Sequence, residues 1–363
     1  MSKNFEPVFS ITPPIARSLM KIEAVKQAIT GLPITPFLLT KLREIALINS
    51  IHYSTKIEGN RLTMEQVQEV ITENKSFPGR ARDEDEVKGY YVATDAMEKY
   101  VAKKVHITQD IIKMLHALIM GRGKKRVKPT PYRDGQNVIL EGVTKKIVYM
   151  PPEAKDVFDL MQQLVTWINR SDYPSPIIAG IAHYQFVTIH SYYDGNGRTA
   201  RILASLILHL GGYDLKGIYS LDQYYAKNLS AYYDALTIGP SHNYYLGCAD
   251  ADITSWIEYF CRGMATAFEN VKKRAEDGAS VGFKDKSEIL RTLDTKKRRV
   301  LELFIKHETV TSAQIAQLFD FKPRTARHLC QKWSDQGFIY AVDTSRKGRR
   351  YKLSKPFVSL LKS

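Results

Sequence analysis

The chain of 363 residues carries 53 Lys and Arg against 38 Asp and Glu, a formal charge of +15 at pH 7. Its 44% apolar and 25% charged content is typical of a folded protein, and its length predicts two or three domains. No apolar stretch approaches the roughly 20 residues that span a bilayer, and the first residues lack the apolar core of a secretory signal. Three scattered cysteines argue against a disulfide framework or a CxxC metal site. These features predict a cytoplasmic protein without a membrane segment.

The positive charge is concentrated at the C-terminal end. Residues 286–363 contain 18 Lys and Arg but 7 Asp and Glu, a net charge of +11. A basic terminal module on a nearly neutral body predicts an anionic partner, with nucleic acid the first candidate. A solvated basic tail is the alternative, but the apolar periodicity of the segment favours a folded module.

The body is predicted to be helical because apolar residues recur at spacings of three and four. The predicted helices cover residues 35–51, 63–71, 86–101, 108–120, 154–168, 176–190, 198–210, 221–236 and 251–274. Residues 138–149 break this pattern: they are rich in β-branched residues, contain Gly142 and precede Pro151, which predicts a small β-hairpin. Residues 275–286, with Gly278 and Gly282, predict a linker.

The basic C-terminal segment predicts three helices followed by a hairpin. An amphipathic helix covers residues 295–306, Ser312 is the expected N-cap of a helix over 313–319, and a third helix runs from Pro323 to about Gln336. Strand-like residues 338–342 and 351–353 then flank a basic turn. This order is the winged helix-turn-helix pattern.

In such a module the second helix of the motif enters the major groove of double-stranded DNA. The residues expected to face the bases are Lys322, Arg324, Thr325, Arg327 and His328. The residues of the wing expected to contact phosphates are Arg346, Lys347, Arg349 and Arg350. The alternative is that the module makes protein contacts.

The sharpest signal is the segment 190–201, His-Ser-Tyr-Tyr-Asp-Gly-Asn-Gly-Arg-Thr-Ala-Arg, between two predicted helices. Gly195 and Gly197 allow a positive-φ turn whose N–H groups form an anion nest, and the following helix adds its N-terminal N–H groups. Arg198 and Arg201 share one face of its first turn, where cations oppose the helix dipole. Two arginines in that place suit a polyphosphate ligand.

Two further side chains complete this constellation. Asp194 is a carboxylate beside the expected phosphates, where Mg²⁺ prefers an oxygen ligand. His190 is a candidate general base. Each piece alone has a plainer explanation, such as a turn, a structural histidine or a helix cap. Their grouping within twelve residues favours a polyphosphate site with a metal ligand and a candidate base.

The segment 190–201 resembles the Fic family motif His-x-Phe-x-Asp/Glu-Gly-Asn-Gly-Arg-x-x-Arg at every polar position, with Tyr192 where Phe is usual. A buried Tyr192 hydroxyl would need a partner. The resemblance extends from about Phe37 to Phe260. It implies a mainly α, helical Fic fold with a small β-hairpin flap, joined to the C-terminal winged helix-turn-helix (α+β) domain. The expected parts are an N-terminal helical region at 1–105, a Fic catalytic core at 106–275, a linker at 276–287 and the winged domain at 288–363.

The resemblance implies a protein adenylyltransferase that moves AMP from ATP to a Ser, Thr or Tyr hydroxyl of a target protein or of the chain itself. His190 would deprotonate that hydroxyl, and Asp194 would hold Mg²⁺ on the phosphates. The residues implied to bind the nucleotide are Gly195, Asn196 and Gly197 around the phosphates, Arg198 at the β-phosphate, Arg201 at the γ-phosphate and Tyr233 near the adenine. The hairpin at 138–149 would be the target-docking flap. Relatives often pair, so a homodimer is an open expectation.

An inhibitory segment is expected at residues 54–60, Ser-Thr-Lys-Ile-Glu-Gly-Asn, which resembles the family's Ser/Thr-x-x-x-Glu-Gly/Asn motif. Its Ser54 and Glu58 occupy the defining positions. The Glu58 carboxylate on Arg201 would replace the γ-phosphate and leave ATP misaligned, and a misplacement of about 1 Å can cost roughly 100-fold in rate. The alternative is an ordinary helix end with Gly59 as its cap.

Other functions remain open at this point. One is a transcription regulator that senses a nucleotide and transfers little. Another is a Fic enzyme that uses a different nucleotide or removes AMP.

Overall fold

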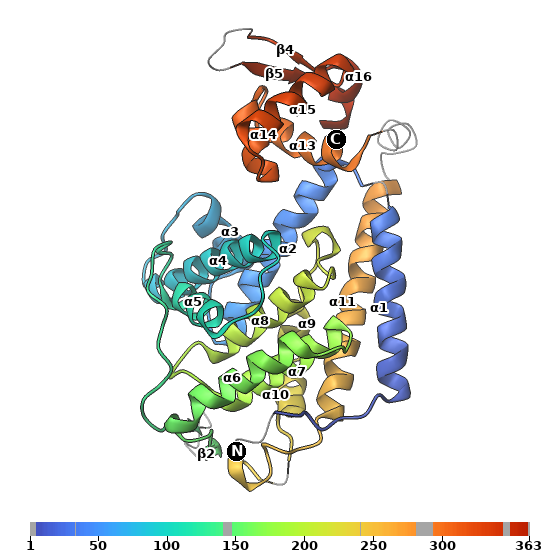
Figure 1. Cartoon of the computed structure of the whole chain (residues 1–363). Coiled ribbons are helices and arrows are strands. Elements are labelled where there is room, and N and C mark those ends of the chain that lie inside the picture. The colour runs from blue at the N-terminus through green and yellow to red at the C-terminus, as the bar shows by residue number, and fades with distance from the viewer. Residues whose placement is uncertain are drawn as a thin grey trace. The chain divides into compact units, whose positions relative to one another are not determined.

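The computed structural model describes residues 5–32, 34–140, 147–239, 241–280, 293–343 and 349–361. The chain forms two compact units (Figure 1). The first consists of Met1–Gln27 and Ala46–Asn270, and the second of Ala28–Ile45 and Val271–Ser363. No helix in the described part of the chain is both long enough and apolar enough to cross a membrane.

The N-terminal helices are α1 (Pro13–Gly31), α2 (Pro36–Ile57), α3 (Met64–Thr72), α4 (Ala81–Ala102) and α5 (Gln109–Met120). The sequence predicted all of these except α1. Local signals fix two of the starts: Thr63 caps α3 in a capping box with Gln66, and the Thr108 side chain accepts a hydrogen bond from the N–H of Ile111 in α5.

The β-hairpin predicted at residues 138–149, the expected flap, is confirmed by the pairing of its two strands. β1 (Ile139–Leu140) pairs antiparallel with β2 (Ile147–Tyr149), with Ile139 opposite Tyr149 and Leu140 opposite Ile147. Residues 141–146 lie outside the described residues. Leu140 and Ile147 are exposed apolar side chains, so the flap presents an apolar strand surface to solvent.

The centre of the first unit is built from α6 (Ala154–Arg170), α7 (Ser175–Ile189) and α8 (Asn196–Leu210). The helices α7 and α8 pack against each other, and α4 and α5 also pack on α8 (Figure 1). Nearly every residue of α7 is buried. A Cβ at Gly180 of α7 would lie only 3.1 Å from the Phe260 ring, so this glycine allows a close helix contact. The core therefore holds rigid the two helices that flank the motif.

One prediction for residues 211–280 was wrong. The single helix expected over 221–236 is two helices, α9 (Asp222–Lys227) and α10 (Leu229–Leu236), separated at Asn228. The break occurs because the Asn228 side chain accepts a hydrogen bond from the N–H of Ala231 at 3.1 Å and so caps α10. A 3₁₀ turn (Tyr244–Leu246) precedes α11 (Thr254–Ser280). The helix α11 ends inside the range predicted for the linker, and residues 281–292 lie outside the described residues.

The second unit contains α13 (Thr295–Lys306), β3 (Val310–Thr311), α14 (Ser312–Phe319), α15 (Pro323–Asp335), β4 (Ile339–Ala341), β5 (Arg350–Leu353) and α16 (Lys355–Val358). Its strands form one antiparallel sheet in the order β3-β5-β4. Its core includes Val300, Leu301, Phe304, Ile315, Cys330, Trp333 and Phe338. The N-cap of α14 is Thr311 and not the predicted Ser312, because Thr311 forms a capping box with Gln314.

Candidate active site

The motif occupies the tight connection between α7 and α8. His190 ends α7 in a left-handed conformation with a φ of 51°, and Gly195 has a φ of 78° directly before α8. The helix α8 begins at Asn196, two residues earlier than the sequence predicted. The Gly-Asn-Gly segment is thus itself the start of a helix, which places its free N–H groups at the positive end of the helix dipole.

Asn196 holds the loop in shape. Its Oδ1 accepts a hydrogen bond from the N–H of Tyr192 at 3.0 Å, and its Nδ2 donates to the carbonyl of the same residue at 2.7 Å. The side chain is buried. Both polar atoms of the amide are therefore used inside the loop.

An aromatic stack lies beneath the loop. The buried Tyr192 ring stacks on His116 of α5, with ring centroids 3.6 Å apart. His116 Nε2 lies 2.9 Å from the Asp194 carbonyl oxygen, and burial lowers the pKa of His116 to about 4. The Tyr192 hydroxyl, expected to need a partner, has none within the described residues. Sequence reasoning missed His116 because only tertiary packing brings it to the motif.

Asp194 presents a carboxylate to solvent at the mouth of the site. Its Oδ1 accepts hydrogen bonds from the Gly195 N–H at 2.6 Å and from Arg198 Nη2 at 3.1 Å, while 60% of the side chain is exposed. The described residues contain no group of three or more His, Cys, Asp or Glu that could hold a metal by themselves. Mg²⁺ commonly takes one or two carboxylates and completes its shell with phosphate and water oxygens. The exposed Asp194 fits a Mg²⁺ ion that arrives with a nucleotide.

His190 has the properties of a base at neutral pH. Its Nδ1 lies 3.4 Å from the Val187 carbonyl oxygen, which can only accept a hydrogen bond. The ring proton therefore belongs on Nδ1, and Nε2 carries the lone pair. Burial is the largest cause that lowers the pKa of His190 to about 4, so the imidazole is neutral at pH 7.

Arg201 meets both predicted residues of the inhibitory segment. Its Nε donates to Ser54 Oγ at 2.8 Å, and its Nη2 donates at 2.8 Å both to the Ser54 carbonyl and to Glu58 Oε1. The Arg201 side chain is 2% exposed. Burial opposes its charge, but Glu58 and other neighbours outweigh burial, and the pKa of Arg201 lies above its usual range. The guanidinium is held in one orientation by the last turns of α2.

Asp222 is a second carboxylate next to Arg201 that sequence reasoning missed. Its Oδ1 lies 3.4 Å from Arg201 Nε, and its Oδ2 accepts a hydrogen bond from Ser50 Oγ at 2.6 Å. Asp222 is buried, and burial raises the pKa of its carboxyl. In the sequence it resembles only an acidic residue at a helix start.

Gly197 lets the inhibitory segment reach the motif. A Cβ at this position would collide with the Glu58 carboxylate and lie 3.1 Å from Arg201 Nη1. The sequence explained this glycine by the phosphate nest alone. The structure adds the close approach of Glu58 as a second reason.

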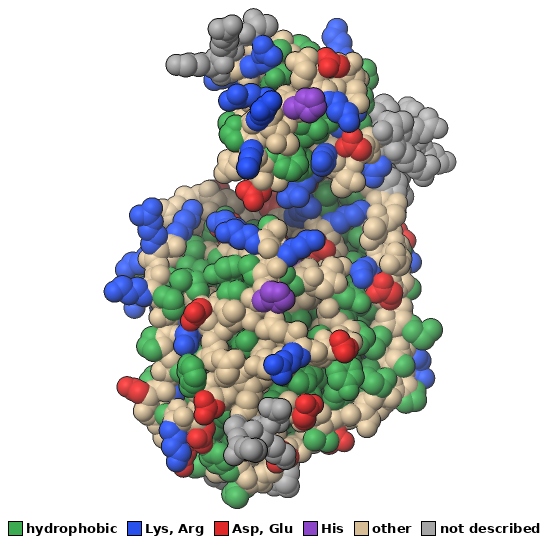
Figure 2. All heavy atoms as spheres, viewed as in Figure 1, with side chains coloured by type: hydrophobic (Ala, Val, Ile, Leu, Met, Phe, Trp, Pro, Cys, Tyr) green, Lys and Arg blue, Asp and Glu red, His purple; other side chains and the backbone are tan. Residues whose placement is uncertain are grey.

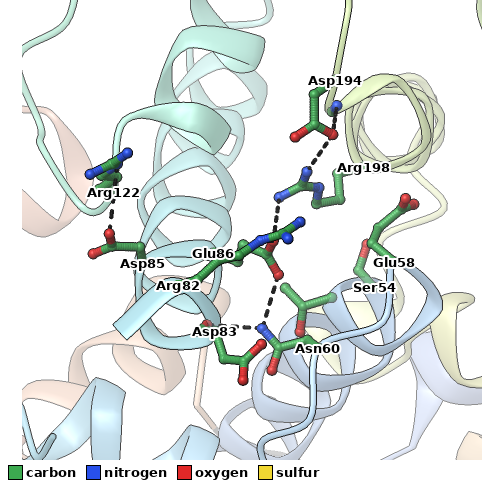
Figure 3. Close-up of polar contacts among 12 residues, drawn as sticks. Ser54, Glu58, Asn60, Arg82, Asp83, Asp85, Glu86, Arg122, Asp194 and Arg198 are labelled. Carbon is green, nitrogen blue, oxygen red and sulfur yellow. Dashed lines mark hydrogen bonds and ion pairs between the residues drawn. The ribbon is translucent and has the colours of Figure 1, made fainter. Parts of the chain in front are cut away.

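Glu86 of α4 joins Arg198 to the end of the inhibitory segment. Figure 3 shows Glu86 between Arg198 and Asn60. Its Oε1 lies 3.9 Å from Arg198 Nη1, and its Oε2 accepts a hydrogen bond from Asn60 Nδ2 at 3.1 Å. Arg82 Nε also donates to Oε1 at 3.2 Å. Glu86 was not predicted, because a Glu in an ordinary helix gives no signal of this role.

Tyr233 lies beside the inhibitory segment. Its ring is partly exposed, and its hydroxyl donates to the carbonyl of Ile57, the residue before Glu58, at 3.4 Å. The position expected to meet the adenine therefore opens toward solvent next to Glu58.

The predicted DNA-facing residues lie on the exposed face of α15. This helix buries Ala326, Cys330 and Trp333 in the core of the second unit. The side chains on its exposed face include Lys322, Arg324, Thr325, Arg327 and His328. Figure 2 shows Lys and Arg side chains gathered on the visible face of this unit. Arg349 and Arg350 are exposed at β5, whereas Arg346 and Lys347 lie outside the described residues.

Comparison with known proteins identifies the central segment. The model of the Fic/DOC family matches residues 106–208, which include α5, the flap and the motif. The chain thus contains a Fic/DOC family domain. A curated relative, protein adenylyltransferase Fic of Drosophila willistoni, is 30% identical over 202 residues, or 54% of this chain. The chain spans 39% of the length of that relative.

Solved structures share the fold. A Fic family protein from Desulfovibrio desulfuricans G20 superposes with a TM-score of 0.61 and 25% identity, covering 97% of this chain and 99% of the other. Fic-1 from C. elegans (residues 134–508) covers 73% of each chain at a TM-score of 0.55 and 23% identity. The second of these shows likeness of fold alone.

Proposed function

We propose that this chain is an autoinhibited protein adenylyltransferase that transfers AMP from ATP to a Ser, Thr or Tyr hydroxyl of a target protein or of itself. The observation that carries the proposal is the contact of Arg201 with both Ser54 and Glu58, one turn of helix from the nest of Gly195 and Gly197. An anion is already bound by the arginine assigned to the γ-phosphate. The relatives named protein adenylyltransferases support the choice of reaction.

The chemistry follows from His190 and the start of α8. The lone pair on His190 Nε2 takes the proton of the target hydroxyl. The hydroxyl oxygen then forms a bond to the α-phosphorus of ATP while the bond to the bridging oxygen breaks, and pyrophosphate leaves. The N–H groups at the start of α8 and the guanidinium of Arg198 stabilise the charge that moves onto the phosphate oxygens.

A magnesium ion held by Asp194 would neutralise charge on the phosphates. The chain's own contribution there is the exposed second oxygen of the Asp194 carboxylate, since the first is already engaged by Gly195 and Arg198. The site as described supplies one protein ligand and leaves the remaining positions to phosphate and water.

Autoinhibition follows from competition for Arg201. Glu58 and the γ-phosphate both require the same buried guanidinium, and the Glu58 carboxylate lies 2.8 Å from it, directly after the C-terminal end of α2. While Glu58 occupies Arg201, the triphosphate binds without its terminal anchor and the α-phosphate is not aligned with the attacking oxygen. Release of Glu58 is then the activating step.

The first test is the intact mass of the protein after incubation with Mg²⁺ and ATP. We expect Glu58→Gly to gain the mass of one or more AMP groups and the parent to gain little. Glu58→Gly/His190→Ala should gain none. Glu73→Gly is the matched control, because it makes the same change at the end of α3, away from Arg201.

Two outcomes would contradict this proposal. A Glu58→Gly protein no more active than the parent would reject autoinhibition. A gain with UTP but not with ATP would replace adenylyl transfer by another nucleotidyl transfer.

We also propose that the second unit binds double-stranded DNA through α15. Its core-facing residues fix which side of the helix is exposed, and that side carries Arg324 and Arg327. We expect Arg324→Ala/Arg327→Ala to weaken binding to a fluorescent duplex, whereas Lys332→Ala near the other end of α15 should leave it unchanged. Equal affinities for all three proteins would reject this interface.

A further inference from the structure

Arg133 is a buried cation at the base of the flap. It is 4% exposed, and among the described residues no carboxylate forms an ion pair with it. Taking an unpaired guanidinium out of water is costly unless its donors are satisfied. The proposed reaction gives this residue no role, since it lies outside the motif and outside the inhibitory segment.

The donors of Arg133 go to three backbone carbonyls. Its Nε donates to His190 at 2.9 Å, its Nη1 to Gly135 at 3.0 Å and its Nη2 to Pro152. Gly135 lies before β1 and Pro152 after β2. One side chain thus ties both ends of the flap to the backbone of the candidate base.

The backbone of His190 needs such support. A left-handed conformation is unfavourable for a residue with a Cβ and persists only where the surroundings hold it. Arg133 supplies two restraints there, through its side chain to the His190 carbonyl and through its own N–H to the Ser191 carbonyl at 3.0 Å. The direction of the imidazole depends on this backbone conformation.

The charge of Arg133 also acts on the imidazole. Burial is the main cause of the lowered pKa of His190, and Arg133 acts in the same direction. The hydrogen bond to Val187 and the carboxylates of Glu58 and Asp194 act in the opposite direction. Arg133 therefore favours the neutral imidazole that a general base requires.

We propose that Arg133 is a positioning residue that holds His190 in register with the flap, on which the target hydroxyl is presented. The inference rests on the proposed function. It predicts that a change at Arg133 alters the proton-transfer step and leaves nucleotide binding intact, because none of its hydrogen bonds reaches Asp194, Arg198 or Arg201.

The test uses the full-length Glu58→Gly protein with and without Arg133→Lys. Lysine keeps the charge but cannot reach three carbonyls at once. We expect kcat to fall by about tenfold or more, while KM for ATP changes by less than about twofold. Arg170→Lys, an exposed arginine at the end of α6, is the control. A parallel change of kcat and KM, or no change in kcat, would overturn the proposal.

A rescue experiment separates positioning from folding. Arg133→Ala in the same background should regain part of its kcat when guanidinium chloride is added at millimolar, non-denaturing concentration. Ammonium chloride at equal ionic strength should not restore it. Equal effects of the two salts would mean that the side chain only stabilises the fold.

A spectroscopic measurement tests the same idea without relying on transfer. The imidazole signal of His190 is identified in an NMR spectrum of histidine-labelled protein by its loss in His190→Gln. Arg133→Lys should shift that signal and leave that of the distant His209 unchanged. If Glu58→Gly shows no transfer, the proposed function fails while this shift still decides the role of Arg133; an unshifted His190 signal rejects it.

Discussion

The arginines of the two units differ in how they are held. In the first unit Arg201 and Arg198 are buried and face carboxylates, namely Glu58, Asp222, Asp194 and Glu86. In the second unit Arg324 and Arg327 are exposed on one face of α15. A buried, oriented guanidinium can exchange one specific anion for another. Exposed cations instead attract a polyanion through their combined electrostatic field, which salt screens. Under the proposed functions, the buried arginines of the first unit would recognise a small ligand and the exposed arginines of the second unit an extended one.

The largest difference between the two units is expected in the free energy of unfolding when one arginine is replaced. Arg201→Met would leave Asp222 and Glu58 without their cation, and breaking a buried pair typically destabilises by about 3–5 kcal/mol. Arg324→Met should change the free energy of unfolding by less than about 0.5 kcal/mol, because its side chain is exposed. Urea unfolding of the full chain measures both. Similar losses for the two variants would contradict the distinction.

Acid should destabilise the first unit selectively. The pKa of His116 and of His190 is lowered to about 4 and that of His183 to about 3, with burial the main cause in each. The unfolded chain binds protons on these groups below about pH 6.5 and the folded chain does not, so stability falls as the pH drops from there toward 4. We expect a loss of about 1–2 kcal/mol per histidine by about pH 5.

The second unit provides the internal control for that experiment. Its described histidines, His307 and His328, are exposed. In calorimetry, a change from about pH 7 to about pH 5 should therefore lower the melting temperature of the first unit more than that of the second. Equal shifts of both transitions would show that the buried histidines are not responsible.

Salt should affect the second unit more than the first. If Arg349 and Arg350 contact phosphates, duplex affinity should fall about tenfold between about 50 and 200 mM salt. Transfer by Glu58→Gly should change by less than about twofold over the same range, since buried charges are screened little. Fluorescence anisotropy and the rate of AMP incorporation measure the two. Salt-insensitive duplex binding would contradict a phosphate contact by these arginines.

The smallest effect is expected for the pH dependence of transfer. A base whose pKa is about 4 is already neutral above pH 6. The kcat of Glu58→Gly should therefore vary by less than about twofold between about pH 6 and 8 and fall below about pH 5. Initial rates in overlapping buffers measure it. An acid limb centred near pH 6.5 would indicate an unperturbed histidine.

The sequence located the parts of the site that are contiguous along the chain. The motif at 190–201 and the inhibitory segment at 54–60 each carry several informative residues at fixed spacing, and the structure brings Ser54 and Glu58 to Arg201 as expected. The exposed face of α15 could also be predicted, because an amphipathic helix buries its apolar stripe.

The residues that sequence reasoning missed are single side chains brought in by packing. Glu86, Arg133 and Asp222 come from α4, the segment before the flap and α9, and nothing in their local sequence distinguishes them from ordinary surface charges. The helix α1 was missed as well. The error at Ser312 arose because the adjacent Thr311 could also cap the helix, and its capping box with Gln314 decided between them. The error at Asn228 arose because its side chain caps a new helix within a stretch whose apolar spacing predicted one continuous helix.

The helix α2 contributes residues to both units, and this affects how a truncated protein should behave. The residues 36–45 at its start belong to the second unit, where Arg43 pairs with Glu302 at 2.7 Å. The last turn of α2 carries Ser54, and Glu58 follows directly after it. A fragment that stops near residue 275 would keep the whole motif but strip the first turns of α2 of these neighbours. The N-terminal turns of α2 would then fray, and the C-terminal end of the same helix contacts Arg201. Under the proposed autoinhibition, we therefore expect such a fragment to hold Glu58 less firmly on Arg201 and to transfer AMP at a different rate from the full chain.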